Sequence, residues 1–192
     1  MSERVRLVFS NIVREPAFAW VAGELGWQPS GESRQYAQSV ERVWQPRNAA
    51  AKVTYVDDRM VDAQYLIVEG AEEDVAAIRE AVGRIAPLAT RGSVRQLMDP
   101  VGEPYDPVLG LYVAALIAPA YADAEILSWI AEAMRHPNAE VRRAACFAAT
   151  YPGWREFEPL LVRAAESDPA AEVRQFASRT LDALRRNAWK EE

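Results

Sequence analysis

One pattern of apolar residues occurs three times in the C-terminal half of this 192-residue chain, and it constrains the fold more than any other feature. Three valines mark the copies, 33 and 32 residues apart: Val108, Val141 and Val173. After each valine the third, fourth, seventh and eighth positions are apolar, except at Thr180. This spacing puts the side chains on one face of a helix. Each valine follows a proline by four residues, at Pro104, Pro137 and Pro169. A chain entering a helix accepts proline there, so three helices are predicted.

A leading helix is predicted before each of these three. Two leading helices share one apolar spacing, 31 residues apart: Ile126, Trp129, Ile130, Ala133 and Met134 correspond to Phe157, Leu160, Leu161, Ala164 and Ala165. The first leading helix starts with the same pattern at Val94 but is cut short by Asp99 and Pro100. Helix pairs in tandem bury their apolar faces against their neighbours. We therefore expect an all-α solenoid of about three helix pairs.

Two of the repeats resemble a known family. The segments HPNAEVRRAACFAATY and DPAAEVRQFASRTLDALRR are similar to the short form of the HEAT repeat, and their Val141-Arg142 and Val173-Arg174 match the Val-Arg pair of that family. The first repeat departs from the pattern, since it has Val108-Leu109. The resemblance covers about half of the chain and implies a HEAT-like solenoid architecture.

The N-terminal half predicts a different kind of domain. Val5, Leu7 and Phe9 alternate with other residues as in a half-buried strand, and a short helix opens at Glu15-Pro16. The polar stretch 28–35 is interpreted as a loop. Three strands at 39–45, 52–56 and 63–69 and a helix at 71–85 follow. The order β-α-β-β-β-α describes an α+β domain in which helices cover one face of an antiparallel sheet. We place this domain at residues 1–88 and the helical repeats at 89–192.

Three carboxylates cluster at the predicted hairpin after residue 56: Asp57, Asp58 and Asp62. A calcium or magnesium site would need converging oxygens of this kind. Hairpin turns also favour aspartate, because its side chain bonds the backbone of the turn. Since the spacing matches no metal-binding loop, we interpret these aspartates as turn residues rather than as metal ligands.

Composition argues against most chemistry. Cys146 is the only cysteine and His136 the only histidine, which excludes a disulfide within the chain and a two-histidine metal site. No nucleophile-elbow or phosphate-loop motif occurs. We therefore expect no catalytic residues, no metal and no cofactor. Charges interrupt the apolar N-terminal run and no apolar stretch is long enough to span a membrane, so we expect a cytoplasmic protein without a secretory signal.

These patterns favour a non-enzymatic protein-interaction module. We expect the binding surface on the second helix of each repeat, between the apolar positions; the candidate contacts are Glu140, Arg142, Arg143, Phe147, Arg174, Ser178 and Arg179. A narrower candidate is a bacterial adaptor or immunity-type protein for a basic partner, because the net charge is −6. The same negative charge disfavours binding to nucleic acid, whose phosphates are also negative.

The alternative is a nucleic-acid-binding protein similar to the DNA glycosylases built from HEAT-like repeats. That resemblance implies a basic concave face with tryptophans and a catalytic aspartate. The residues that could supply part of it are Trp129, Trp154, Arg142, Arg143, Arg163, Arg174 and Arg179.

Overall fold

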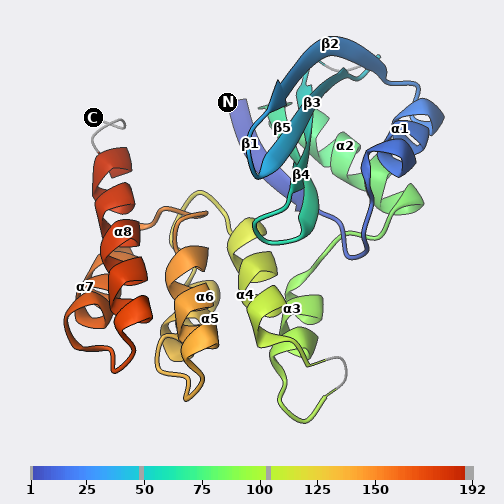
Figure 1. Ribbon diagram of the computed structural model, residues 1–192. Helices are drawn as coiled ribbons and strands as arrows, with labels where there is room; N and C mark the ends of the chain where they lie inside the picture. The colour runs from blue at the N-terminus through green and yellow to red at the C-terminus, as the bar shows by residue number, and fades with distance from the viewer. Residues whose placement is uncertain (1, 48–49, 103–104, 189–192) are drawn as a thin grey trace. The chain divides into compact units, whose positions relative to one another are not determined.

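The computed structural model describes residues 2–47, 50–102 and 105–188 (Figure 1). They divide into two compact units, Met1–Thr90 and Arg91–Glu192. Unit 1 is an antiparallel sheet with two helices, and unit 2 consists of helices. Among the described residues no helix is both long and apolar enough to cross a bilayer. The predicted order, an α+β part followed by a helical solenoid, is confirmed.

Unit 1 contains five strands in the spatial order β1-β5-β4-β3-β2. Their bounds are β1 Ser2–Val8, β2 Gln28–Gln35, β3 Ser39–Gln45, β4 Lys52–Asp58 and β5 Ala63–Ala71, and every neighbouring pair is antiparallel. Helices α1 (Glu15–Glu24) and α2 (Glu72–Ile85) pack on one face of the sheet through a shared apolar core. At its centre Phe18 of α1 stacks on Tyr55 of β4, with ring centroids 4.7 Å apart.

The loop predicted for residues 28–35 is wrong, because this segment forms strand β2 at the edge of the sheet. All eight of its residues are exposed, so neither side of the strand requires apolar residues and the sequence shows no alternation. The strand is held by backbone pairing with β3, which is irregular between Pro29 and Ser33. Backbone pairing leaves no side-chain signature, and proline and glycine in the segment suggest a turn instead.

Unit 2 is built from three helix pairs, as the repeats predict. The pairs are α3 (Arg91–Met98) with α4 (Pro107–Leu116), α5 (Ala124–Ala133) with α6 (Ala139–Ala148), and α7 (Glu158–Ser167) with α8 (Ala171–Ala188). The short α3 ends before Asp99-Pro100, and a single 3₁₀ turn, Arg155–Phe157, leads into α7. Pro137 and Pro169 lie in the turns that enter α6 and α8. Pro104 lies outside the described residues.

Side-chain caps set where two of the second helices begin. Asp106 accepts a hydrogen bond from Leu109 N–H at the start of α4, and Asn138 accepts one from Glu140 N–H at the start of α6. These bonds satisfy backbone donors that the helix itself cannot. The marker residues Val141 and Val173 are buried, as are Leu111 and Ala145. The repeated apolar pattern is therefore the core of unit 2.

Candidate interaction surface of the second helices

The second helices of the three pairs form one layer of unit 2 (Figure 1). Helix α6 packs against both α4 and α8. Helices α6 and α8 each bury one side and expose the opposite one, whereas α4 is mostly buried and reaches solvent only through half-buried side chains such as Tyr112. We define the second-helix surface by the outward residues that the next paragraphs describe: Tyr112, Glu140, Arg143, Phe147, Tyr151, Phe176 and Arg179.

Four aromatic rings contact one another across this surface. Phe147 of α6 meets Tyr112 of α4 and Phe176 of α8, with a centroid distance of 5.9 Å in each case. Tyr151, just after α6, lies 5.7 Å from Phe147. All three contacts are edge-to-face, an arrangement that the ring quadrupoles favour. The four rings are half-buried, so this aromatic row joins three helices and still presents apolar surface to solvent.

Charged residues flank the aromatic row. The guanidinium carbon of Arg143 lies 5.8 Å from the centroid of the Phe176 ring, within the range of a cation–π contact. Burial raises the pKa of Tyr112, while the positive charge of Arg143 lowers it and the negative charge of Glu140 raises it. Both charges therefore act on the tyrosine hydroxyl. The surface combines aromatic rings with one acidic and one basic residue of α6.

Most of the sequence-predicted contact residues reach solvent. Glu140, Arg143, Ser178 and Arg179 are exposed, and Phe147 and Arg174 are half-buried. Phe147 and Arg143 both contact Phe176, so the structure brings these two predicted residues together.

Sequence reasoning missed Tyr112, Tyr151 and Phe176 as surface residues. Tyr112 and Phe176 occur at positions of the apolar pattern, which predicts them as core residues. They lie at the edge of the buried face, where a large ring is only partly covered. The other copies of the repeat have Ala145 and Ala177 at the position of Tyr112, and Leu111 and Ala144 at the position of Phe176. An aromatic ring at such a position is the signal that could have identified these two residues.

The predicted exposure of Arg142 is wrong, because its side chain is buried in an ion pair. Only 8% of the residue is exposed. Its Nε and Nη2 donate to the two carboxylate oxygens of Asp168 at 2.8 and 3.0 Å, and its Nη1 donates to the carbonyls of His136 and Pro137 at 2.8 and 2.9 Å. The guanidinium holds the pKa of Asp168 below its ordinary value. Arg142 thus joins the second pair to the turn of the third, and we call the Arg142–Asp168 ion pair the clamp.

Arg174 occupies the equivalent position of the third pair and repeats half of this geometry. Its Nη1 donates to the carbonyls of Asp168 and Pro169 at 2.6 and 3.2 Å, as Arg142 does in its own turn. Its Nε and Nη2 make no hydrogen bond with the described residues. The difference follows from position, because no further helix pair among the described residues offers a carboxylate.

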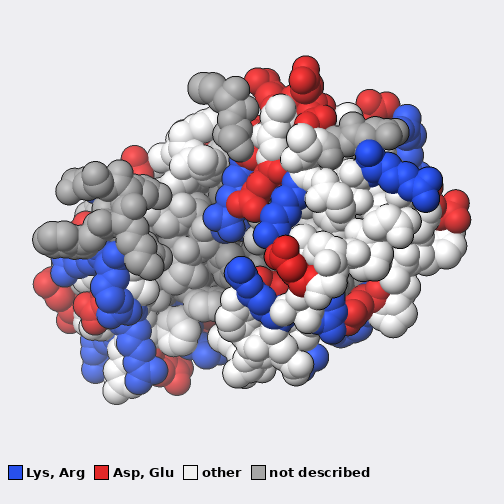
Figure 2. Space-filling view, turned by 90° about the horizontal axis from the view of Figure 1, so that it is seen from above, with Lys and Arg blue, Asp and Glu red and all other residues white. Residues whose placement is uncertain are grey.

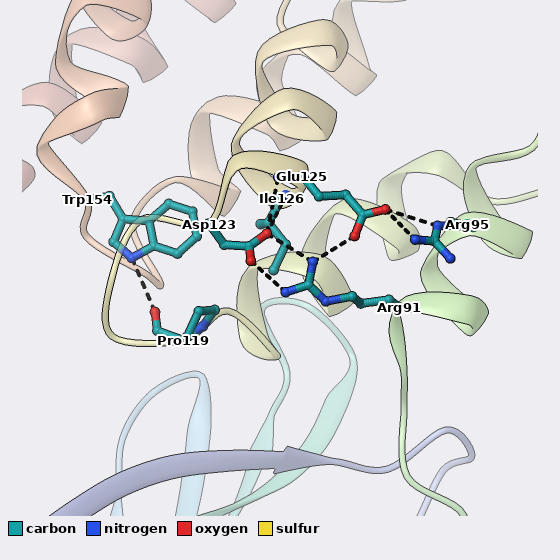
Figure 3. Close-up of polar contacts among 7 residues, drawn as sticks. All are labelled: Arg91, Arg95, Pro119, Asp123, Glu125, Ile126 and Trp154. Carbon is teal, nitrogen blue, oxygen red and sulfur yellow. Dashed lines mark hydrogen bonds and ion pairs between the residues drawn. The ribbon is translucent and has the colours of Figure 1, made fainter.

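The first and second pairs are joined by an ionic network at the other edge of the array (Figure 3). Arg91 of α3 donates to Asp123 through Nη2 at 2.6 Å and to Glu125 through Nη1 at 2.7 Å. Arg95 donates to the same Glu125, and Asp123 also caps the backbone N–H groups of Glu125 and Ile126. Hydrogen bonds from Arg91 lower the pKa of both carboxyls. We call these four side chains the α3–α5 network.

The cysteine and the histidine of unit 2 hold structural positions. Cys146 is fully buried in α6, and burial raises the pKa of its thiol to about 12, so it is a thiol rather than a nucleophilic thiolate near neutral pH. His136 lies in the turn after α5, and its Nδ1 accepts the N–H of Asn138 at 3.1 Å.

The aspartates of the β4–β5 hairpin are engaged with protein groups. Arg14 lies 3.6 Å from Asp57 and 3.3 Å from Asp62, and Asp58 accepts the N–H of Met60 in the turn. Asp62 has a φ of 47°, a left-handed conformation that aspartate tolerates in turns. The described residues contain no group of three or more histidine, cysteine or carboxylate side chains suited to a metal ion.

Two residues on which the nucleic-acid alternative relies have internal roles. Arg142 is paired with Asp168, and Trp154 is buried, with its Nε1 donating to the carbonyl of Pro119 at 3.2 Å (Figure 3). On the face drawn in Figure 2, basic and acidic side chains are interspersed and neither sign covers that face. Phosphate binding favours concentrated positive charge, which this face does not offer.

Comparison with known proteins gives one family for part of the chain. Residues 126–189 match the family model described as HEAT repeats. This segment contains all but the first two residues of the second helix pair, the third pair and both Val-Arg dipeptides, so the resemblance seen in the sequence is confirmed for this part. The N-terminal part has no family match. No curated protein and no solved structure matches the chain.

Proposed function

We propose that this chain is a non-enzymatic protein-interaction module that binds another protein through its second-helix surface. HEAT repeats are commonly protein-interaction scaffolds. The aromatic row is the observation that carries the proposal for this chain. Aromatic and arginine side chains are enriched in protein interfaces, where they contribute most of the binding energy. Rings already held by their neighbours lose little conformational freedom when a partner covers them.

The charges around the row bear on the kind of partner. The net charge of −6 steers basic proteins toward the chain as a whole, as an adaptor or immunity-type role for a basic partner would require. On the second-helix surface itself, however, the exposed charged residues are of both signs: Arg143 and Arg179 are positive and Glu140 is negative. We therefore propose a contact that is apolar at its centre, with charges of both signs at its rim. A cytoplasmic setting in a bacterium belongs to the same proposal.

The test is to capture the partner from the source cells with the tagged full-length chain and to measure the dissociation constant of the purified pair. Replacing Phe147 by Ala should weaken binding by tenfold or more, roughly the loss seen on truncating a central aromatic contact. The double variant Arg143→Glu/Arg179→Glu should weaken it as well. Arg79→Glu/Arg84→Glu, at two exposed positions of α2 in unit 1, makes the same change of net charge and should leave the constant unchanged.

Circular dichroism and thermal unfolding should first establish that each variant is folded. Equal affinity of wild type, Phe147→Ala and the double variant for the partner would exclude the second-helix surface as the binding site. The nucleic-acid alternative predicts that the wild-type chain retards a DNA duplex and that added salt abolishes the shift. If the wild-type chain retards the duplex and Arg143→Glu/Arg179→Glu does not, the second-helix surface binds nucleic acid and our proposal is wrong.

A further inference from the structure

A groove lies between the first helices of the second and third pairs, away from the second-helix surface. It is lined by α5, α7 and the turns that follow them, and its volume of about 450 Å³ is within the range of ligand pockets, about 300–1,000 Å³. Half-buried Met134, directly after α5, and half-buried Leu160 of α7 supply apolar lining, with buried Ala164 beside them. An apolar side chain of a ligand would lose its contact with water there, which favours its binding.

The charges that line the groove are almost entirely positive. Arg135 and Arg163 are exposed at its edge, and the guanidinium of Arg163 makes no hydrogen bond or ion pair with the described residues. The only carboxylate among the lining residues is Asp168, which is buried and neutralised by Arg142. In a chain of net charge −6, the charged residues that line this groove therefore carry a net positive charge. It favours an acidic ligand.

The turn residues of the groove add one directed donor, and four of their carbonyls already accept hydrogen bonds. The carbonyls of His136 and Pro137 are occupied by Arg142, and those of Asp168 and Pro169 by Arg174. Because Nδ1 of His136 accepts the N–H of Asn138, its proton in the neutral ring is on Nε2, which remains a donor. Occupied carbonyls repel a carboxylate less than free ones at a helix C-terminus would. The groove is thus prepared for an anionic group.

We propose that this groove binds a peptide segment of a partner protein in which one apolar side chain is flanked by aspartate or glutamate. The apolar side chain lies against Met134 and Leu160, and the carboxylates face Arg135 and Arg163. This site uses the first helices, so it is independent of the second-helix surface. Binding weakens as salt rises, because both arginines are exposed and their field is screened.

The test is selection of a displayed library of random dodecapeptides against the immobilised full-length chain, followed by fluorescence anisotropy with the enriched peptides. We expect enriched sequences with an apolar residue between acidic ones. Their dissociation constants should rise about tenfold for Arg135→Glu/Arg163→Glu, because exposed charges at the rim of a binding site contribute moderately to affinity. Arg135→Lys/Arg163→Lys keeps the charge and should retain most of the affinity. Arg143→Glu/Arg179→Glu, on the second-helix surface, should have no effect.

Three outcomes would overturn the proposal. The selection could enrich no acidic peptides, or the enriched peptides could bind Arg135→Glu/Arg163→Glu as well as wild type. In the third, acidic peptides lose binding only to Arg143→Glu/Arg179→Glu, which places them on the second-helix surface and supports that surface instead. Failure of the second-helix surface in its own test would leave the groove result intact, because the two variant sets share no residue.

Discussion

The two boundaries between helix pairs are held by ionic contacts of different kinds. Between the second and third pairs, Arg142 and Asp168 form a buried pair whose side chains are 10% and 5% exposed. Between the first and second pairs, the α3–α5 network is more open, with Arg91 42% and Glu125 32% exposed. Two charges removed from water depend on each other, whereas exposed charges are also stabilised by solvent. The first boundary should therefore tolerate losses that the second does not.

The difference between the boundaries follows from one position in the repeat. The second and third pairs carry arginine after the marker valine, but the first pair has Leu109. The first pair cannot form the same ion pair, and its ionic contact with the next pair comes instead from the leading helix, through Arg91 and Arg95. A repeat that departs from the pattern is thus joined to its neighbour by a different part of its structure.

Removing the carboxylate of the clamp should give the largest loss. Asp168→Ala leaves the buried guanidinium of Arg142 without its counterion and the N–H of Ala170 without its acceptor. We expect the free energy of unfolding to fall by about 2–3 kcal/mol, between the values for exposed and for deeply buried pairs. Urea denaturation of the full-length chain measures it. Asp182→Ala, an exposed aspartate on α8, is the matched control and should change little.

A double-mutant cycle with Arg142→Ala sharpens this prediction. If the two residues act as a pair, the double variant should be much less destabilised than the sum of the single variants. Additive losses would mean that the two side chains stabilise the fold separately.

Acid should reproduce part of this loss. The pKa of Asp168 is lowered from its ordinary 3.8, first by the hydrogen bonds from Arg142, so the folded state favours the charged form. A lowered carboxyl pKa contributes stability above the unfolded value, and this stability is lost as pH falls through the folded pKa. Unfolding measured from pH 6 down to about pH 3 should show the decline.

Asp168→Asn isolates this contribution, because Asp123 and Glu125 also have lowered pKa values and weaken the other boundary in acid. The variant should start less stable and decline less steeply below pH 5. Parallel curves for wild type and Asp168→Asn would show that protonation of Asp168 does not matter to the fold.

Periodicity predicted the helices but not the clamp. Apolar spacing indicates which helix face is buried, and it placed Arg142 between the core positions and therefore in solvent. The arginine is buried because Asp168 of the next pair reaches over it, 26 residues along the chain. The sequence does hold a signal for this contact. Asp168 directly precedes Pro169, at the position of the third repeat that His136 holds before Pro137 in the second. A charge that recurs within a repeat and a complementary charge in the following turn should be tested as a pair.

The sheet of unit 1 shows a second limit of prediction from apolar spacing. Strands with a buried face were predicted because their alternation records that face, but β2 has no buried face to record. The same holds for the candidate surface, where Tyr112 and Phe176 satisfy both a core pattern and an exposed role. Sequence patterns predict burial against a neighbour when the neighbour is apolar. They are silent where the backbone or a single charge makes the contact.

Weakening the α3–α5 network should cost less than breaking the clamp. Arg91→Gln removes the contacts to Asp123 and Glu125 but leaves Asp123 as the cap of α5. Because the side chain is 42% exposed, we expect a loss below about 1 kcal/mol, and a smaller one at high salt. Urea unfolding at low and high salt measures both. A loss as large as that of Asp168→Ala would contradict the distinction between the two boundaries.

Arg174 should give the smallest effect, although its sequence context is that of Arg142. Both arginines follow a marker valine and donate Nη1 to two carbonyls of their own turn, but only Arg142 reaches a carboxylate of a following pair. Arg174→Gln should therefore reduce the free energy of unfolding by about 0.5 kcal/mol or less, against about 2 kcal/mol or more for Arg142→Gln. Equal losses in the two variants would assign the stabilisation to the carbonyl hydrogen bonds that they share. A large difference assigns it to Asp168, the carboxylate that Arg142 contacts and Arg174 does not.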